Sequence, residues 1–240
     1  MRPDIADKIM AEVQESYDAI ASDFSATRLR PWPEMKLLRQ YLRPGAVVLD
    51  VGCGNGRLYQ SLADVTTSYV GVDVSAGLLA EARRLQAGTP AVFKAGSLLA
   101  LPAPDASADL VAALASLNHI PSAPYRLKAM REMARVLKPG GTLFMTNWNL
   151  FKLDRRWRWV ARAVWERLRG RFPFDWNDLL IPWKRGAVRQ RYYHVFTSGE
   201  MARLCRRAGL EIVTQFYSHG GEPTPWWRGD NLVTVARRSA

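Results

Sequence analysis

The chain has 240 residues, of which 48% are hydrophobic, and its formal net charge is +12. This length and apolar content suffice for one full α/β domain with an insertion and a sizeable core, so two small domains are the less favoured arrangement. No apolar stretch approaches the roughly 18 residues of a membrane helix, and two cysteines do not suggest a disulfide framework or a zinc site.

The positive charge has two interpretations. It favours encounters with polyanions such as nucleic acid, or with an anionic surface; alternatively, the arginines are merely solvated on helix faces. The start of the chain has no apolar signal core, so we expect a cytoplasmic protein without a membrane partner. Cys53 and Cys205 fit reducing surroundings, and His119, His194 and His219 are too scattered to propose a metal site.

The first part of the chain predicts a helical cap over residues 1–43. Apolar residues at near-helical spacing predict an amphipathic helix over 5–24. The segment Arg30-Pro31-Trp32-Pro33 breaks this pattern, and a second helix is expected over 34–42, before Pro44-Gly45.

Beyond residue 45, strand patterns alternate with helix patterns. Strands are expected at 46–51, 68–72, 91–94, 110–114, 142–146, 210–217 and 232–236, and helices at 58–63, 75–85, 125–137 and 198–208, with Ser75 and Ser198 as caps. This alternation predicts a doubly wound, Rossmann-like sheet of seven strands in a single domain, residues 1–240. The ligand of such a sheet lies beyond the carboxyl ends of its strands.

The α/β rhythm is interrupted over residues 150–195, after the fifth strand. This basic insertion holds twelve lysines and arginines against four acidic residues, with five tryptophans interleaved. Basic side chains would neutralise phosphates while aromatic rings stack on unpaired bases. Equally, an apolar helix face would pack on the sheet with the arginines outward; its residues are Trp157, Val160, Ala161, Val164, Trp165 and Leu168.

A glycine-rich turn follows the first strand. Gly52, Gly54 and Gly56 occupy every second position, and Asp50 precedes them. Glycines let the main chain approach a ligand, and the following helix offers free N–H groups. A dinucleotide fold would place its third glycine at Arg57. The turn instead looks like the S-adenosylmethionine loop of class I methyltransferases, although a simple strand-to-helix corner is the plainer alternative.

Further cofactor contacts are expected at the tips of the next strands. Asp73 ends the second strand, where it would grip the ribose or else cap the next helix. Ser97 stands where methyltransferases usually carry an acid against the adenine, and Leu98 follows it. Asn118, or its neighbour His119, is expected near the methyl-donor pocket. Tyr17 and Val74 complete the predicted set.

Several segments together resemble the tRNA wobble-uridine carboxymethyl methyltransferases, which include the methyltransferase domain fused to an AlkB-type hydroxylase. They are residues 17–33, 50–57, 132–141, 191–196 and 228–231. The resemblance implies S-adenosylmethionine as cofactor, methyl esterification of a carboxymethyl group on uridine 34 of tRNA, and in eukaryotes a small zinc-binding activating partner. The chain departs from the pattern at Ser97, at Asn118, in the basic insertion and in residues 222–227, so the substrate stays open.

The predicted acceptor site rests on this resemblance and on carboxylate chemistry. A carboxylate is ionised at pH 7 and needs no general base, whereas its recognition needs a fork of donors. We therefore predict Arg28 and His194 as catalytic residues, against the alternatives of a surface arginine and ordinary strand packing. The predicted substrate-binding residues are Arg28, Arg30, Trp148, Arg189, Arg191, Tyr192, Tyr193 and His194.

Two other functions remain open from the sequence. One is a small-molecule O- or C-methyltransferase in which the insertion forms a lid over an apolar pocket. The other is a non-catalytic module that binds RNA or a membrane surface and has lost its cofactor; Ser97 favours it, and the intact glycine turn with Asp73 opposes it. No Asn/Asp-Pro-Pro-aromatic signature of amine methylation occurs in the chain.

Overall fold

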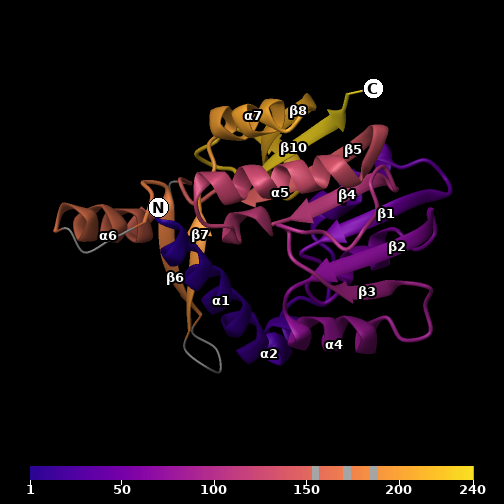
Figure 1. The fold of residues 1–240 in the computed structure, drawn as a ribbon, viewed down its shortest axis with the longest axis horizontal. Coiled ribbons are helices and arrows are strands. Elements are labelled where there is room, and N and C mark those ends of the chain that lie inside the picture. Colours follow the sequence, from indigo (N-terminus) through magenta and orange to yellow (C-terminus); the bar gives the residue numbers. More distant parts are fainter. Residues whose placement is uncertain (153–156, 170–173, 184–188, 240) are drawn as a thin grey trace.

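An eight-stranded sheet forms the centre of the computed structural model, which describes residues 1–152, 157–169, 174–183 and 189–239 (Figure 1). The strands lie in the order β3 (Val92–Ala95), β2 (Thr66–Asp73), β1 (Ala46–Val51), β4 (Ala108–Leu114), β5 (Leu137–Trp148), β10 (Asn231–Arg238), β8 (Leu210–His219) and β9 (Glu222–Thr224). The first five run parallel, and the last three pair antiparallel. The predicted α/β fold is confirmed, whereas the predicted count of seven strands omits β9.

The strands of this sheet alternate their side chains between two cores. Leu49 and Val111 face one core with α5 (Ala123–Val136) and α7 (Ser198–Arg207). Val48 and Leu110 face the other core. That second core includes α4 (Ala76–Leu85) and the short helices α3 (Pro33–Leu37), η1 (Leu38–Tyr41) and η2 (Arg57–Ser61). Because successive strand residues point to opposite faces, helices on both sides bury nearly every residue of β4.

The predicted N-terminal helix is broken into two. Helix α1 (Pro3–Ala19) ends at the buried Ile20, whose backbone is non-helical, and α2 (Ala21–Ala26) follows. The carboxylate of Asp18 at this break accepts hydrogen bonds from Ser75 Oγ at 2.6 Å and from the Gly77 amide at 3.0 Å. The end of α1 is thereby fastened to the start of α4, which brings the helical cap over the carboxyl ends of the strands.

Two further helix predictions are corrected. The helices expected over 34–42 and 58–63 are the short elements α3, η1 and η2. Ser75 caps α4 as predicted, since its hydroxyl accepts the Leu78 amide. The cap of α7 is Thr197, whose hydroxyl accepts the Glu200 amide, and Ser198 is already the first helical residue.

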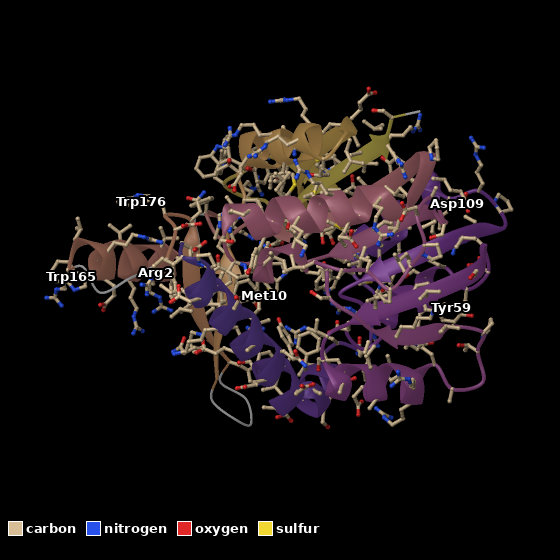
Figure 2. The ribbon with its side chains drawn as sticks, viewed as in Figure 1. Arg2, Met10, Tyr59, Asp109, Trp165 and Trp176 are labelled. Carbon is tan, nitrogen blue, oxygen red and sulfur yellow. The ribbon has the colours of Figure 1, made fainter. Side chains whose placement is uncertain are left out.

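Between β5 and α7 the chain forms α6 (Trp157–Leu168) and a separate antiparallel hairpin of β6 (Asp178–Trp183) and β7 (Arg189–His194). Helix α6 projects away from the central sheet (Figure 1), so its apolar face does not pack there as expected; it contacts β6 instead, and Val160 packs against the core of the β6–β7 hairpin. Trp165 is 53% exposed and Leu168 75% exposed, and Figure 2 places Trp165 and Trp176 at the periphery. Within the described residues, no helix is long and apolar enough to cross a membrane.

Candidate active site

The glycine turn after β1 contains three residues in the left-handed conformation, and their surroundings differ. Gly52, Gly54 and Gly56 have φ of 75°, 55° and 73°. A Cβ on Gly52 would lie 2.3 Å from the Cβ of Ser116, and one on Gly56 would lie 2.7 Å from the Phe93 ring. At Gly54 the nearest atom, on Phe24, is 3.9 Å away. Gly52 and Gly56 thus permit close packing, while Gly54 opens the turn toward empty space.

That space is a cavity of about 450 Å³ between α1, the glycine turn and the ends of β1, β2 and β4. Gly52 and Gly54 line it as predicted, and Gly56 does not. An open groove adjoins the cavity and is lined by residues 26–33 and by Trp183; Arg57 and Trp148 line both spaces. An adenosyl group fits the cavity by chemistry, because apolar Leu78, Leu98 and Leu99 lie on its wall together with two carboxylates.

One of these carboxylates, Asp73, joins the glycine turn to α4. Its two oxygens accept the Gly54 amide at 2.8 Å and the Ser75 amide at 2.9 Å. Burial raises the pKa of Asp73, and these backbone hydrogen bonds oppose the rise. The helix cap that was the alternative for Asp73 is supplied by Ser75. Asp73 therefore holds the turn in place while it lines the cavity.

Asp50 is the second carboxylate of the cavity wall. It is 2% exposed and accepts a hydrogen bond from the Tyr69 hydroxyl at 2.5 Å. Burial raises the pKa of Asp50 to about 7 against this hydrogen bond, and the nearby Asp73 adds to the rise. A cationic ligand group beside Asp50 would favour its ionised form.

His119 lines the cavity, and Asn118 does not. The Nδ1 of His119 donates to the Tyr192 carbonyl at 2.9 Å, so its Nε2 accepts from the Tyr17 hydroxyl at 2.9 Å. Burial lowers the pKa of His119 to about 4, which keeps the ring neutral. Asn118 is fully buried and bonds the His194 carbonyl and the Trp148 amide, so its predicted cofactor contact is corrected in favour of His119.

The remaining predicted cofactor residues lie on the cavity wall. Tyr17, Val74, Ser97 and Leu98 all line it. The hydroxyl of Ser97 accepts the amide of Leu99 at 3.1 Å, and thereby shapes the loop after β3.

Three arginines, Arg28, Arg57 and Arg191, line the cavity. Arg28 lies over the Phe24 ring at 4.1 Å and donates to the Thr27 hydroxyl. Arg57 lies over Trp32 at 4.0 Å; burial lowers its pKa to about 10, and the charge of Arg28 contributes. Arg57 was missed from the sequence, although it directly follows the last glycine of the turn.

Arg191 is the third of these arginines. It is 5% exposed and lies 5.0 Å from the Trp183 ring and 5.3 Å from the Tyr193 ring. Tyr193 in turn stacks on Trp148, with ring centroids 5.2 Å apart and planes inclined by 16°. Arg191, Tyr193 and Trp148, three of the predicted substrate residues, line the cavity.

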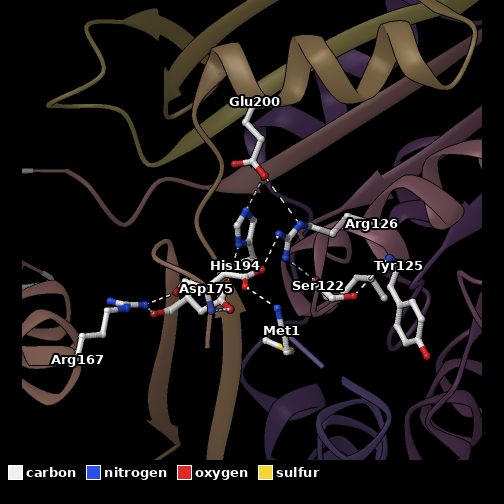
Figure 3. Close-up of polar contacts among 10 residues, drawn as sticks. Met1, Ser122, Tyr125, Arg126, Arg167, Asp175, His194 and Glu200 are labelled. Carbon is white, nitrogen blue, oxygen red and sulfur yellow. Dashed lines mark hydrogen bonds and ion pairs between the residues drawn. The ribbon is translucent and has the colours of Figure 1, made fainter. Parts of the chain in front are cut away.

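The predicted catalytic His194 lies elsewhere. It is 2% exposed and bonds Asp178 at 2.7 Å and Glu200 at 2.9 Å, in the network of Figure 3 that also contains Arg126 and Asp175. Burial alone would lower the pKa of His194, but the hydrogen bonds to Asp178 and Glu200 raise it. His194 fastens the hairpin to α7 and does not contact the cavity, so its predicted catalytic and substrate roles are corrected.

Three other predicted substrate residues also lie away from the cavity. Tyr192 packs against Ile9 and Val13 of α1. Arg30 lines only the outer groove. The side chain of Arg189 lies outside the described part of the chain.

Comparisons with known proteins agree with this geometry. Residues 49–145 match the methyltransferase domain family. The chain is 30% identical to the tRNA (carboxymethyluridine(34)-5-O)-methyltransferase of Schizosaccharomyces pombe, over 90% of this chain and 93% of that protein. An Encephalitozoon cuniculi protein named as a methyltransferase is 33% identical, over 88% and 90% of the two chains.

Solved structures share the fold. A methyltransferase dependent on S-adenosylmethionine from Methanosarcina mazei superposes with a TM-score of 0.68 at 21% identity, covering 88% of this chain and 99% of its own. A methyltransferase from Haloferax volcanii, solved with the activator Trm112, superposes with a TM-score of 0.66 at 21% identity, covering 95% and 98%. The chain is thus a class I methyltransferase that uses S-adenosylmethionine, and it belongs to the family that contains the tRNA (carboxymethyluridine(34)-5-O)-methyltransferases.

Proposed function

We propose that the enzyme transfers the methyl group of S-adenosylmethionine to the carboxylate of a carboxymethyl group on the wobble uridine of tRNA. The observation that carries this proposal is the set of three arginines, Arg28, Arg57 and Arg191, that line one cavity. An anionic acceptor would offset their mutual repulsion, which contributes to the lowered pKa of Arg57. The Schizosaccharomyces pombe relative is named for this reaction.

The residues of the cavity divide into donor and acceptor sides. When bound, S-adenosylmethionine supplies an electrophilic sulfonium methyl group. Asp50 is suited to its ammonium group and Asp73 to its ribose hydroxyls, while Leu98 and Leu99 provide an apolar wall for adenine. Arg28 and Arg191 lie on the other side, where the acceptor would enter from the groove.

The transfer needs orientation and no proton removal. A carboxylate oxygen forms the new O–C bond while the S–C bond breaks, and the bond's electron pair stays on sulfur as a thioether. His119 is neutral and already bonded at both ring nitrogens, which fits a reaction without a general base. The arginines would hold the acceptor oxygen in line with the methyl group and exclude water.

Charge and exposed aromatic side chains support tRNA as the macromolecular partner. Arg162 and Arg169 of the α6 segment are exposed beside Trp165, and Arg169 lies over that ring at 4.1 Å. We infer that this projecting helix contacts tRNA phosphates and loop bases. We also propose a small zinc-binding activating subunit from the sequence resemblance, and the Haloferax volcanii neighbour, solved with the activator Trm112, supports this proposal.

The test uses purified protein, methyl-labelled donor and tRNA from cells that leave the wobble carboxymethyl group unmethylated. Label should enter the tRNA and be released by mild alkali as methanol, because a methyl ester hydrolyses where an ether does not. Label in a small-molecule extract with none in RNA would reject the proposal. That result would favour a small-molecule methyltransferase with the β6–β7 hairpin as a lid. The apolar wall of the cavity supports this alternative.

A further inference from the structure

We propose that Arg191 selects the acceptor's carboxylate, and that Trp148, Trp183 and Tyr193 form the aromatic slot that receives the acceptor base. This inference rests on the proposed function and assigns the specificity of that site to a residue of the β6–β7 hairpin. From the sequence, Arg28 was the predicted residue that binds the acceptor's carboxylate. The present assignment gives this contact to Arg191, in the insertion, instead of to a residue of the N-terminal cap.

The first observation is a buried guanidinium with two nitrogen atoms that lack hydrogen-bond partners among the described residues. Arg191 is 5% exposed, and its Nε and Nη1 atoms have no hydrogen-bond partner among the described residues. Burying a charge without paired hydrogen bonds is costly, and such orphans are rare in folded proteins. Nε and Nη1 are themselves covered, but Arg191 lines the cavity, so a shift of its side chain would let a ligand carboxylate bond its guanidinium.

The neighbouring arginines are placed for other tasks. Arg28 is half-buried and already donates to the Thr27 hydroxyl at 2.8 Å. Arg57 directly follows Gly56 and lies near the buried carboxylate of Asp50, which raises its pKa against the effect of burial. We therefore assign Arg57, which lies near Asp50 and lines both the cavity and the groove, to the methionyl carboxylate of the cofactor.

A second buried donor lies next to Arg191. Trp183 is 8% exposed, and its indole Nε1 has no hydrogen-bond partner among the described residues. Both Arg28 and Arg191 lie over its ring, at 5.3 Å and 5.0 Å. Trp183 lines the outer groove, and Trp148 lines both groove and cavity. The slot thus combines aromatic rings for a pyrimidine with a guanidinium for its carboxylate substituent, and a small shift of Trp183 would bring its covered N–H to a pyrimidine carbonyl.

Discrimination between a carboxylate and its uncharged amide follows from this placement. A carboxylate can accept two parallel N–H bonds from Arg191, whereas a carbamoyl group offers a single oxygen and brings its own N–H donors. We expect the protein to bind an anticodon stem-loop with carboxymethyluridine about tenfold more tightly than one with carbamoylmethyluridine, which corresponds to one charged hydrogen bond.

The experiment measures these two affinities in the presence of S-adenosylhomocysteine, for Arg191→Gln, Arg191→Lys and the control Arg206→Gln. Arg206 is exposed on α7 and lies outside the cavity and the groove, and its replacement removes the same charge. Arg191→Gln should abolish the preference for the carboxylate, Arg191→Lys should retain part of it, and Arg206→Gln should keep it. The affinity for S-adenosylhomocysteine, measured by calorimetry, should change by less than about twofold in all three, since no donor contact is lost.

Two outcomes would overturn the assignment. One is a loss of S-adenosylhomocysteine affinity in Arg191→Gln with the carboxylate preference intact, which would assign Arg191 to the donor's own carboxylate. The other is equal behaviour of Arg191→Gln and Arg206→Gln. If Arg191→Gln does not fold, Arg191→Lys and Trp183→Phe decide, because Trp183→Phe removes the indole donor and part of the ring but no charge, and should weaken both stem-loops equally.

Failure of the proposed function has a different signature. A wild-type protein that neither prefers the carboxymethyl stem-loop nor methylates it would reject the function itself. A wild-type protein that methylates it, with an unchanged preference in Arg191→Gln, would reject only the role of Arg191.

Discussion

At the scale of single residues, the glycines of the turn after β1 are required for two different reasons. Gly52 is required because a side chain there would collide with Ser116, and Gly54 because a side chain there would enter the cavity. The sequence pattern predicts both positions without distinguishing the reasons, since the collision partner is 64 residues away in the chain and is brought close only by the parallel pairing of β1 with β4.

Replacing Gly54 by alanine should impair donor binding more than folding. Gly88 is the matched control, because its φ of 79° carries the same left-handed strain and a Cβ there would meet nothing within 4 Å. Both Gly54→Ala and Gly88→Ala should lower the free energy of unfolding by about 1 kcal/mol. Only Gly54→Ala should weaken S-adenosylhomocysteine binding, by roughly tenfold or more; equal affinities by calorimetry would contradict the role assigned to Gly54.

The buried carboxylate of Asp50 should make stability depend on pH. Its pKa is about 7 when folded and near 3.8 otherwise, so the folded state holds the proton more tightly and stability falls as pH rises from about 4 to 7. Asp50→Asn should remove this fall. At pH 8 the variant should be more stable than the wild type by on the order of 1–3 kcal/mol, while binding the donor product more weakly.

Urea denaturation at pH 5 and pH 8 measures this effect, with Asp64→Asn as the control. Asp64 is exposed and paired with Arg39, so its replacement should leave the pH dependence of the wild type nearly unchanged. A fall in stability between pH 5 and pH 8 that persists undiminished in Asp50→Asn would contradict the account of this group.

At the scale of elements, the β6–β7 hairpin explains why only two of the four residues 191–194 line the cavity. Residues 191–194 were all predicted to contact substrate, yet successive strand residues point to opposite faces. Arg191 and Tyr193 line the cavity, whereas Tyr192 packs on α1 and His194 bonds Asp178. The strand pattern could have predicted that only alternate residues share a face; which pair faces the cavity depends on how the hairpin docks.

The His194 network should stabilise this hairpin most at low pH. The raised pKa of His194 means that its contribution is fully present below about pH 6.5 and is lost as pH rises through the folded value. His194→Gln should cost about 3 kcal/mol at pH 6 and less at pH 9. The control His219→Gln, at an exposed histidine paired with Asp230, should have little effect at either pH; a His194 effect that grows with pH would oppose this account.

The projecting helix α6 shows a limit of hydrophobic periodicity. The spacing of its apolar residues predicts that one face is apolar, but it does not specify what covers that face. Trp165→Ala should therefore change the free energy of unfolding by less than about 0.5 kcal/mol, because the ring is 53% exposed. Trp183→Ala, at 8% exposure in the hairpin, should cost about 3 kcal/mol or more in the same urea titration. Similar costs for both would mean that the Trp165 ring is buried against the body.

At the scale of the whole molecule, local signals predicted most of the sheet. Strand β1 has the predicted bounds, and the ends of the other six predicted strands lie within two residues of the observed ones, except that β5 starts five residues earlier than predicted. The agreement arises because buried strands read as apolar runs between turn residues. Strand β9 could not be predicted: its three residues, Glu222–Thr224, include a proline and have no apolar pattern. It exists because the chain turns back along β8 at Gly220 and Gly221.

The site required tertiary information that the sequence lacks. Tyr17, Arg57 and Arg191 line one cavity although they are far apart in the chain. The glycine turn and Asp73 could be placed together from the general rule that ligands lie at the carboxyl ends of parallel strands. The contribution of the hairpin could not, because β6 and β7 form a separate sheet whose position is set by packing against α1 and by the His194 network.

The most direct measurement is mass spectrometry of the nucleosides of a tRNA that carries carboxymethyluridine at its wobble position, after incubation with purified protein and S-adenosylmethionine. The account predicts conversion of carboxymethyluridine to its methyl ester, with no methyl group on any other nucleoside. Unchanged carboxymethyluridine, in a sample whose protein binds S-adenosylhomocysteine and tRNA, would contradict it.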